Sequence, residues 1–193
     1  DLGTNVDCRP VQLLSFAVMG DVFARLFWNV DNPRVALLSV GSETGKGNRQ
    51  VRETTELLAN SSLNFIGNVE ANDLPNDAAD IVVCDGFVGN IVMKLTEGIG
   101  GALVRHLYER LSGKLPHDEI KKLTKEIYDL HNVVESHGGG PLLGIKGVSV
   151  VGHGRAKSDA VHRAIGQAIK TVETDFISRV SEQLVRFQEK TNP

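Results

Sequence analysis

The hydrophobic residues of this chain follow two alternating patterns, short continuous runs and longer stretches with helical spacing. The continuous runs are typical of strands buried on both faces, and they lie at residues 34–41, 63–67, 80–84 and 147–152. The stretches with helical spacing predict helices over residues 11–28, 49–59 and 116–134. They also predict a long helix that follows residues 85–90 and ends near residue 111, and one last helix from Ser158 through Leu184. Pro10 suits the first position of the first helix.

Strands that alternate with helices indicate an α/β protein with a largely parallel sheet. Residues 112–130 are the most charged and the least sheet-like part of the chain. We therefore expect a helical hairpin near residues 101–135 that stands off the sheet.

Composition excludes several classes of function. The chain has 193 residues, of which 41% are apolar, and this is enough for a sizeable core. Lys and Arg total 21 against 24 Asp and Glu, and this balance argues against a nucleic-acid-binding domain. No uninterrupted apolar run approaches the roughly 18 residues of a membrane-spanning helix. The only cysteines, Cys8 and Cys84, suit a reducing cytoplasm.

The chain opens on residues 1–5, Asp-Leu-Gly-Thr-Asn, with no Met and no lead-in. This segment resembles the end of a strand that runs into a polar turn. We expect residues 1–193 to be the C-terminal portion of a longer α/β enzyme whose N-terminal half is absent.

The positions of the 20 glycines indicate a binding site for an anion. Glycine-rich turns follow three of the predicted strands, at residues 41–48, 85–90 and 152–158. In open α/β sheets such turns offer backbone N–H groups beside helix N-termini, where ligands bind. Three of them in one chain predict phosphate chemistry.

Two of these turns resemble nucleotide-binding motifs without matching them. Residues 41–47 have three residues between the first two glycines instead of the four of a P-loop, and Gly47 stands where the P-loop has Ser or Thr. Residues 152–157 lack the third glycine of the dinucleotide fingerprint. The sequence therefore supports neither an ATPase nor an NAD enzyme.

Four side chains near these turns are candidates for chemistry, each with a plainer alternative. Lys46 either holds phosphate as a point charge or is a solvated loop lysine. Asp85 either orients a nucleophile or Lys46, or caps a helix. Cys84 is an acyl acceptor or, as its apolar neighbours favour, a buried structural thiol. His153 is either catalytic or an ordinary turn residue.

Taken together, these stretches resemble the bacterial phosphate acyltransferases that make acyl phosphate for phospholipid synthesis. The Cys-Asp-Gly-Phe-x-Gly-Asn block at residues 84–90 is the most specific match, and the likeness spans nearly the whole chain. The matching stretches are residues 1–10, 37–41, 46–48, 64–70, 79–94, 139–144 and 153–154. The usual Glu-Glu pair after Gly41 is Ser42-Glu43 here.

The resemblance implies a three-layer α/β/α fold similar to that of phosphotransacetylase and the isocitrate and isopropylmalate dehydrogenases. It implies that acyl-(acyl carrier protein) and inorganic phosphate react to give acyl phosphate and free carrier protein, without a metal or a cofactor. It also implies a cytoplasmic homodimer with peripheral membrane contact. The helical tip implicated in that contact corresponds to residues 111–116, which are not very apolar.

The resemblance and the chemistry of phosphate together suggest roles for particular residues. We expect the phosphate to be held by Lys46, Asn48 and the backbone around Gly86, Gly89 and Gly154. Asn5 and Asn90 donate amide hydrogen bonds to phosphate or to the developing oxyanion. Asp85 accepts a phosphate O–H or positions Lys46, and His153 polarises the carbonyl or stabilises charge.

The acidic carrier protein requires a local basic surface on a chain of net charge −3. The candidates are Arg105, Arg110, Lys114, Lys121, Lys122 and Lys125. Ordinary solvated helix faces are the alternative interpretation. Two other functions stay open: a phosphotransacetylase-like enzyme that uses acyl-coenzyme A, and a non-catalytic scaffold in lipid synthesis.

Overall fold

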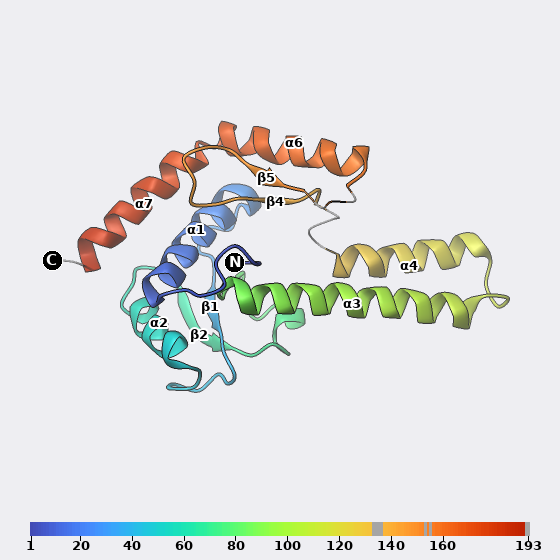
Figure 1. Ribbon diagram of the computed structural model, residues 1–193, viewed down its shortest axis with the longest axis horizontal. Coiled ribbons are helices and arrows are strands. Elements are labelled where there is room, and N and C mark those ends of the chain that lie inside the picture. Colours follow the sequence, from blue (N-terminus) through green and yellow to red (C-terminus); the bar gives the residue numbers. More distant parts are fainter. Residues whose placement is uncertain (133–136, 153, 155, 192–193) are drawn as a thin grey trace. The chain divides into compact units, whose positions relative to one another are not determined.

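The computed structural model describes residues 1–132, 137–152, 154 and 156–191, and Figure 1 shows their elements in chain order. The chain divides into two compact units. The first contains residues 1–90, 143–147 and 170–193, and the second contains residues 91–142 and 148–169.

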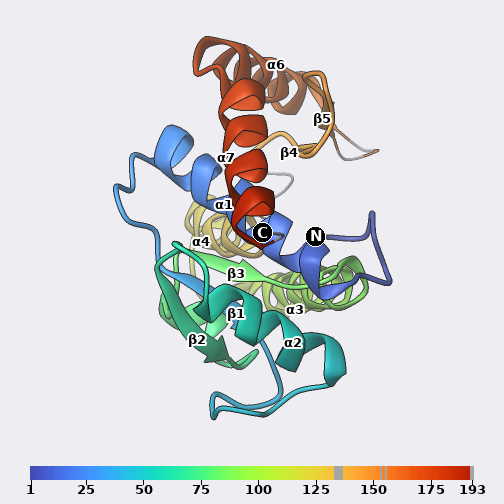
Figure 2. The ribbon, with the colours of Figure 1, turned by 90° about the vertical axis from the view of Figure 1, so that its left-hand side faces the viewer.

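The first unit is built on a parallel sheet of three strands, β1 (Val35–Leu38), β2 (Phe65–Val69) and β3 (Ile81–Val83). Their order is β2-β1-β3, and β1 pairs in parallel with both neighbours. The helices α1 (Pro10–Trp28) and α2 (Arg49–Ala59) pack against the sheet (Figure 2). A parallel sheet flanked by helices confirms the predicted α/β class and is consistent with the three-layer α/β/α fold.

The ends of α1 follow from local chemistry. Pro10 is its first residue, as predicted, because the first helical N–H has no partner inside the helix. The helix ends at Asn29, which adopts the left-handed conformation with φ of 56° and donates its N–H to the carbonyl of Ala24. Asparagine tolerates this conformation better than most residues, so the sequence sets both ends of α1.

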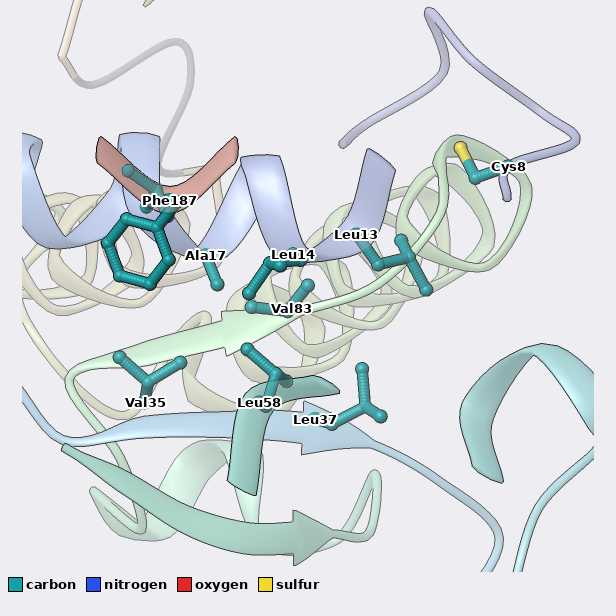
Figure 3. Close-up of a cluster of buried hydrophobic side chains, with 10 residues drawn as sticks. Cys8, Leu13, Leu14, Ala17, Val35, Leu37, Leu58, Val83 and Phe187 are labelled. Atoms are coloured by element: carbon teal, nitrogen blue, oxygen red, sulfur yellow. The ribbon is translucent and has the colours of Figure 1, made fainter. Parts of the chain in front are cut away.

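The core of the first unit lies between α1, the sheet and the last helix, α7 (Phe176–Thr191). Figure 3 shows Leu14 and Ala17 of α1 beside Val83 of β3. The other side chains of this cluster are Cys8, Leu13, Val18, Val35, Leu37, Leu58 and Phe187. Burial of these apolar groups, each about 1.5–3 kcal/mol for a large side chain, fixes β1 and β3 in their places.

The predicted last helix is two helices, and this corrects the sequence interpretation. It breaks between α6 (Ser158–Glu173) and α7 at Asp175, where φ is +49°. Asp175 accepts a hydrogen bond from the Ser178 hydroxyl at 2.7 Å. Asp is tolerated in the left-handed region, and continuous apolar spacing gave no sign of the break.

The second unit contains most of α3 (Gly86–Leu111) and all of α4 (His117–His131), which lie side by side in opposite directions (Figure 1). Gly100 of α3 allows this packing, because a Cβ there would overlap the side chain of His131. Near the other end, the Tyr108 hydroxyl lies 3.3 Å from Nδ1 of His117.

The strand predicted at residues 147–152 does not join the parallel sheet. Only β5 (Val150–Val151) forms, and it pairs antiparallel with β4 (Gly140–Pro141) in a separate two-stranded sheet. Gly139 has a φ of 134° and leaves no room for a Cβ beside the carbonyl of Val151. The continuous apolar run therefore predicted a strand but not its sheet.

Two helices of the described chain, α1 and α3, are long and apolar enough to span a membrane by length and composition alone. The search for uninterrupted apolar runs did not detect them. In α1 the apolar stretch is 44% buried and forms the core of the first unit, whereas in α3 it is only 11% buried.

Candidate functional site

The candidate site lies at the edge of the sheet where β1 and β3 end. Because these neighbouring strands are parallel, the loop of residues 39–48 after β1 and Asp85 after β3 leave the sheet at the same edge. This is the position at which open α/β sheets bind ligands. The structure thus brings together two of the three predicted glycine-rich turns.

A third segment, residues 1–5, is held at this edge by hydrogen bonds and forms no strand, contrary to expectation. The N–H of Gly86 donates to the carbonyl of Asn5 at 2.8 Å. The backbone nitrogen of Asp1 donates to the carbonyl of Cys84 at 3.2 Å. Residues 1–5 are therefore attached to the first turn of α3 and to the residue that follows β3.

The carboxylate of Asp1 organises this segment. Its Oδ1 accepts the backbone N–H groups of Gly3 and Thr4, both at 2.8 Å. Its Oδ2 accepts the backbone N–H of Asn5 at 2.9 Å and the side-chain Nδ2 of Asn5 at 2.7 Å. Bonds to a charged acceptor are roughly twice as strong as those between neutral groups, so this turn is firmly held.

Gly86 and Gly89 are required by close packing against the same segment. A Cβ at Gly86 would lie 2.8 Å from both the carbonyl oxygen of Asn5 and Oδ1 of Asp1. A Cβ at Gly89 would overlap the carbonyl oxygen of Asp1. Any larger side chain would displace residues 1–5 from α3.

Three amides at the start of α3 donate within the chain. The N–H of Gly86 donates to the carbonyl of Asn5, and that of Gly89 donates to the backbone carbonyl of Asp85 at 2.9 Å. Oδ1 of Asp85 accepts the N–H of Val88 at 2.8 Å. The backbone around Gly86 and Gly89 was expected to hold phosphate, and that role stays a prediction.

Asp85 and Asn90 both lie beside residues 1–5. Asp85 is half-buried and caps α3 through its Oδ1, and a role toward phosphate or Lys46 stays a prediction. Within the described chain, its Oδ2 accepts no side-chain or backbone hydrogen bond. Asn90 is exposed in the second turn of α3, and a Cβ at Gly3 would lie 3.6 Å from its Oδ1. The amides of Asn5 and Asn90 therefore flank one turn.

The loop after β1 carries Lys46, which is exposed and forms no ion pair with a described carboxylate. Gly41 is buried, and a Cβ there would lie 2.8 Å from Oε2 of Glu43 and 3.1 Å from Cγ of Lys46. The side chains of Glu43 and Lys46 therefore both pack against Gly41. Asn48 caps α2 by accepting the N–H of Val51 at 2.9 Å. Its phosphate-binding role stays a prediction.

One hydroxyl in this loop was missed by the sequence analysis. Oγ of Ser39 is buried and has no hydrogen-bond partner among the described residues. It lies under Gly47, where a Cβ would come within 3.1 Å of it. Gly47 has a φ of 99°, so the loop folds over Ser39 in a conformation that favours glycine.

The two cysteines lack the environment of a nucleophile. Burial raises the pKa of the Cys84 thiol, whose Sγ lies 3.8 Å from the carbonyl oxygen of Asp1. Burial likewise raises the pKa of Cys8, which donates to the carbonyl of Asn5 at 3.3 Å. A thiolate is the reactive form, so the structural interpretation of Cys84 is favoured.

The remaining predicted residues are His153, Gly154 and the basic candidates. His153 falls outside the described residues. Gly154 belongs to the second unit and follows β5, a strand of the separate sheet. The basic candidates on α3, on α4 and between them are all exposed, and Lys125 forms an ion pair with Asp129.

Comparisons with known proteins agree on one family. The model of the family described as "Fatty acid synthesis protein" matches residues 1–179. A phosphate acyltransferase of Desulfitobacterium hafniense (strain DSM 10664 / DCB-2) is 43% identical over 192 residues, covering 97% of this chain and 57% of the relative. One from Thermodesulfovibrio yellowstonii is 42% identical over 194 residues, covering 98% and 56%. The chain thus spans little more than half the length of these relatives.

The contact between Gly89 and Asp1 predicts a sharp difference between two glycines of α3. Gly89→Ala should lower the free energy of unfolding by about 1–3 kcal/mol, because the added methyl overlaps the Asp1 carbonyl. Gly98→Ala is the matched control: nothing lies within 4 Å of its Cβ position, and alanine should stabilise the helix by about 0.5–1 kcal/mol. Urea denaturation measures both, and equal effects would contradict the close approach.

Proposed function

This chain belongs to the fatty acid synthesis protein family, and we propose that the protein is a phosphate acyltransferase. The reaction joins inorganic phosphate to the acyl group of acyl-(acyl carrier protein) and releases free carrier protein. The observation that carries the proposal is that the parallel strands β1 and β3 end at one edge of the sheet. The loop with Lys46, which forms no ion pair with a described carboxylate, follows β1, and the segments that carry Asn5 and Asn90 are joined beside the end of β3. Relatives named phosphate acyltransferase, which match 97–98% of the chain, support it.

The first task of such a site is to bind and partly dehydrate phosphate. Lys46 supplies the positive charge, and its glycine-rich loop lets the backbone approach the anion. The Asn90 amide is exposed at the start of α3 and supplies a neutral donor. Oδ2 of Asp85, which accepts no hydrogen bond from a described residue, accepts a phosphate O–H. The chain thereby favours the protonated anion, because a carboxylate repels the bare dianion.

The second task is the transfer itself. A phosphate oxygen attacks the thioester carbon, the carbonyl oxygen becomes an oxyanion, and the carbon–sulfur bond then breaks. Asn5 donates to the oxyanion, and one such donor is worth about 3 kcal/mol in other acyl transfers. The carrier leaves as a thiolate whose thiol has a pKa of about 8–9, so no general acid is needed. His153 stays a candidate for polarising the carbonyl.

The proposal also names the acyl donor, which is an acylated carrier protein. Exposed cations lie along α3 and α4, and these two helices approach each other closely at Gly100 and His131. A carrier protein is acidic, so these cations would guide its docking through complementary charge. Acyl-coenzyme A is the alternative donor. A scaffold without activity is the alternative function.

The homodimer and the membrane contact expected from the resemblance stay predictions. The feature that either contact would use is a row of exposed apolar residues on α3, spaced by four: Ile91, Leu95, Ile99 and Leu103, which are 49%, 61%, 48% and 42% exposed. Such a row on one face of a helix is typical of a buried contact surface.

Removal of Lys46 tests the phosphate site. Lys46→Ala in the intact protein should reduce acyl phosphate formation from acyl-(acyl carrier protein) by at least about a hundredfold, because the phosphate loses its only charged partner in the loop. Mass spectrometry of the product measures the rate. Lys146→Ala, at another exposed loop lysine, should leave the rate unchanged. Near-normal turnover by Lys46→Ala would remove the catalytic assignment and favour the scaffold.

Reversal of charge on α4 tests the carrier surface. The double substitution Lys121→Glu and Lys122→Glu should raise the KM for acyl-(acyl carrier protein) about tenfold at low salt, while the KM for phosphate stays constant. The effect should shrink as salt is added, because salt screens exposed charges. An unchanged KM for the carrier, or equal turnover of acyl-coenzyme A by the unaltered protein, would refute the carrier assignment.

A further inference from the structure

The carboxylate of Asp1 has no role in the reaction described above, although it is the most heavily hydrogen-bonded side chain at the site. Four donors converge on it: the backbone N–H groups of Gly3, Thr4 and Asn5 and the side-chain Nδ2 of Asn5. Three of these bonds would suffice to close the turn. The fourth reaches a side chain that the proposed function places at the reacting carbonyl.

That fourth bond fixes which way the Asn5 carboxamide faces. A carboxylate only accepts hydrogen bonds, so the atom 2.7 Å from Oδ2 of Asp1 must be the amide nitrogen. The nitrogen carries two hydrogens, and it donates one of them in the hydrogen bond to Asp1. The second N–H of Asn5 remains, in an orientation that the carboxylate determines.

The turn that carries Asp1 and Asn5 has little freedom to move. The carbonyl of Asn5 accepts the N–H of Gly86, and the carbonyl of Asp1 occupies the space that a side chain at Gly89 would fill. Helix α3 thus holds the backbone at both ends of the turn. With the backbone fixed, the bond to Asp1 decides the direction of the Asn5 amide.

We propose that Asp1 is a positioning residue that orients the Asn5 amide toward the oxyanion of the acyl transfer. This inference rests on the proposed function, because it assumes that Asn5 contacts the reacting acyl group. A preorganised donor stabilises the transition state without reorientation during the reaction, and a small misplacement of such a group costs about a hundredfold in rate.

A cycle of two substitutions in the intact protein separates positioning from general stabilisation. Asp1→Asn replaces one of the two acceptor oxygens with an NH2 group. The four donors then share a single acceptor oxygen, so the Asn5 amide loses its anchor. We expect Asp1→Asn and Asn5→Ala each to lower kcat by about a hundredfold, with little change in the KM for phosphate. The double variant should be no slower than Asn5→Ala, because Asp1 acts only through Asn5.

Two further variants keep this test decisive. Asp7→Asn removes another carboxylate of the N-terminal segment, one that accepts none of the four bonds, and should leave kcat unchanged. Should Asp1→Asn fail to fold by circular dichroism, Asp1→Ser removes the carboxylate without presenting an NH2 group to Asn5 and takes its place in the cycle.

The outcomes distinguish this inference from the proposed function. Normal kcat in Asn5→Ala would remove Asn5 from the reaction, and the positioning role with it, while acyl phosphate formation by the unaltered protein would leave the proposed function standing. A slow Asn5→Ala together with a normal Asp1→Asn would overturn the positioning role alone. Rate losses that multiply in the double variant would also overturn it, since they would show an independent effect of Asp1.

Discussion

The arrangement at this site depends on the close approach of residues 1–5 to the first turn of α3. Gly86 and Gly89 have no side chains, and this lets the backbone of Asp1 and Asn5 lie directly on the helix. The N–H of Gly86 donates to the carbonyl of Asn5 across this contact, so the start of α3 supports residues 1–5. The position of residues 1–5 on α3 follows from this one steric fact.

The core of the first unit makes that approach possible. Leu13 and Leu14 of α1 pack in the same cluster as Val83 of β3, and Cys8 connects this cluster to the turn through the carbonyl of Asn5. The side-chain amide of Gln50 at the start of α2 donates to the carbonyl of Cys8 at 2.6 Å. The segment before α1 is thus tied both to α2 and to α3. Apolar burial sets the positions, and hydrogen bonds at the edge set the orientations.

Most helices and the three parallel strands were predictable because they depend on local spacing. Pro10, the run before Gly41 and the helical period of residues 49–59 each carry their own signal. The break at Asp175 and the separate pairing of β5 were not predictable, because a left-handed residue and a choice of sheet leave no mark in apolar periodicity.

The turns at the candidate site were predictable, but the use of their atoms was not. Two predicted glycine-rich turns follow β1 and β3 at one edge of the sheet, and the phosphate site there stays a prediction. The same glycines were interpreted as phosphate cradles, whereas Gly86 and Gly89 serve close packing. A glycine can leave its backbone accessible to a ligand, or it can allow another segment to pack closely on it. Which of the two applies depends on the segment opposite the glycine. That segment, which begins at Asp1, lies more than eighty residues away in sequence.

The proposed function requires that phosphate itself attacks the acyl group at this edge. The most direct measurement supplies the intact protein with acyl-(acyl carrier protein) and phosphate labelled with heavy oxygen at every position, and determines the product by mass spectrometry. Attack by phosphate predicts acyl phosphate that retains all of the label, with release of free carrier protein. Unlabelled fatty acid as the only product would show that water is the nucleophile and would contradict the proposed function.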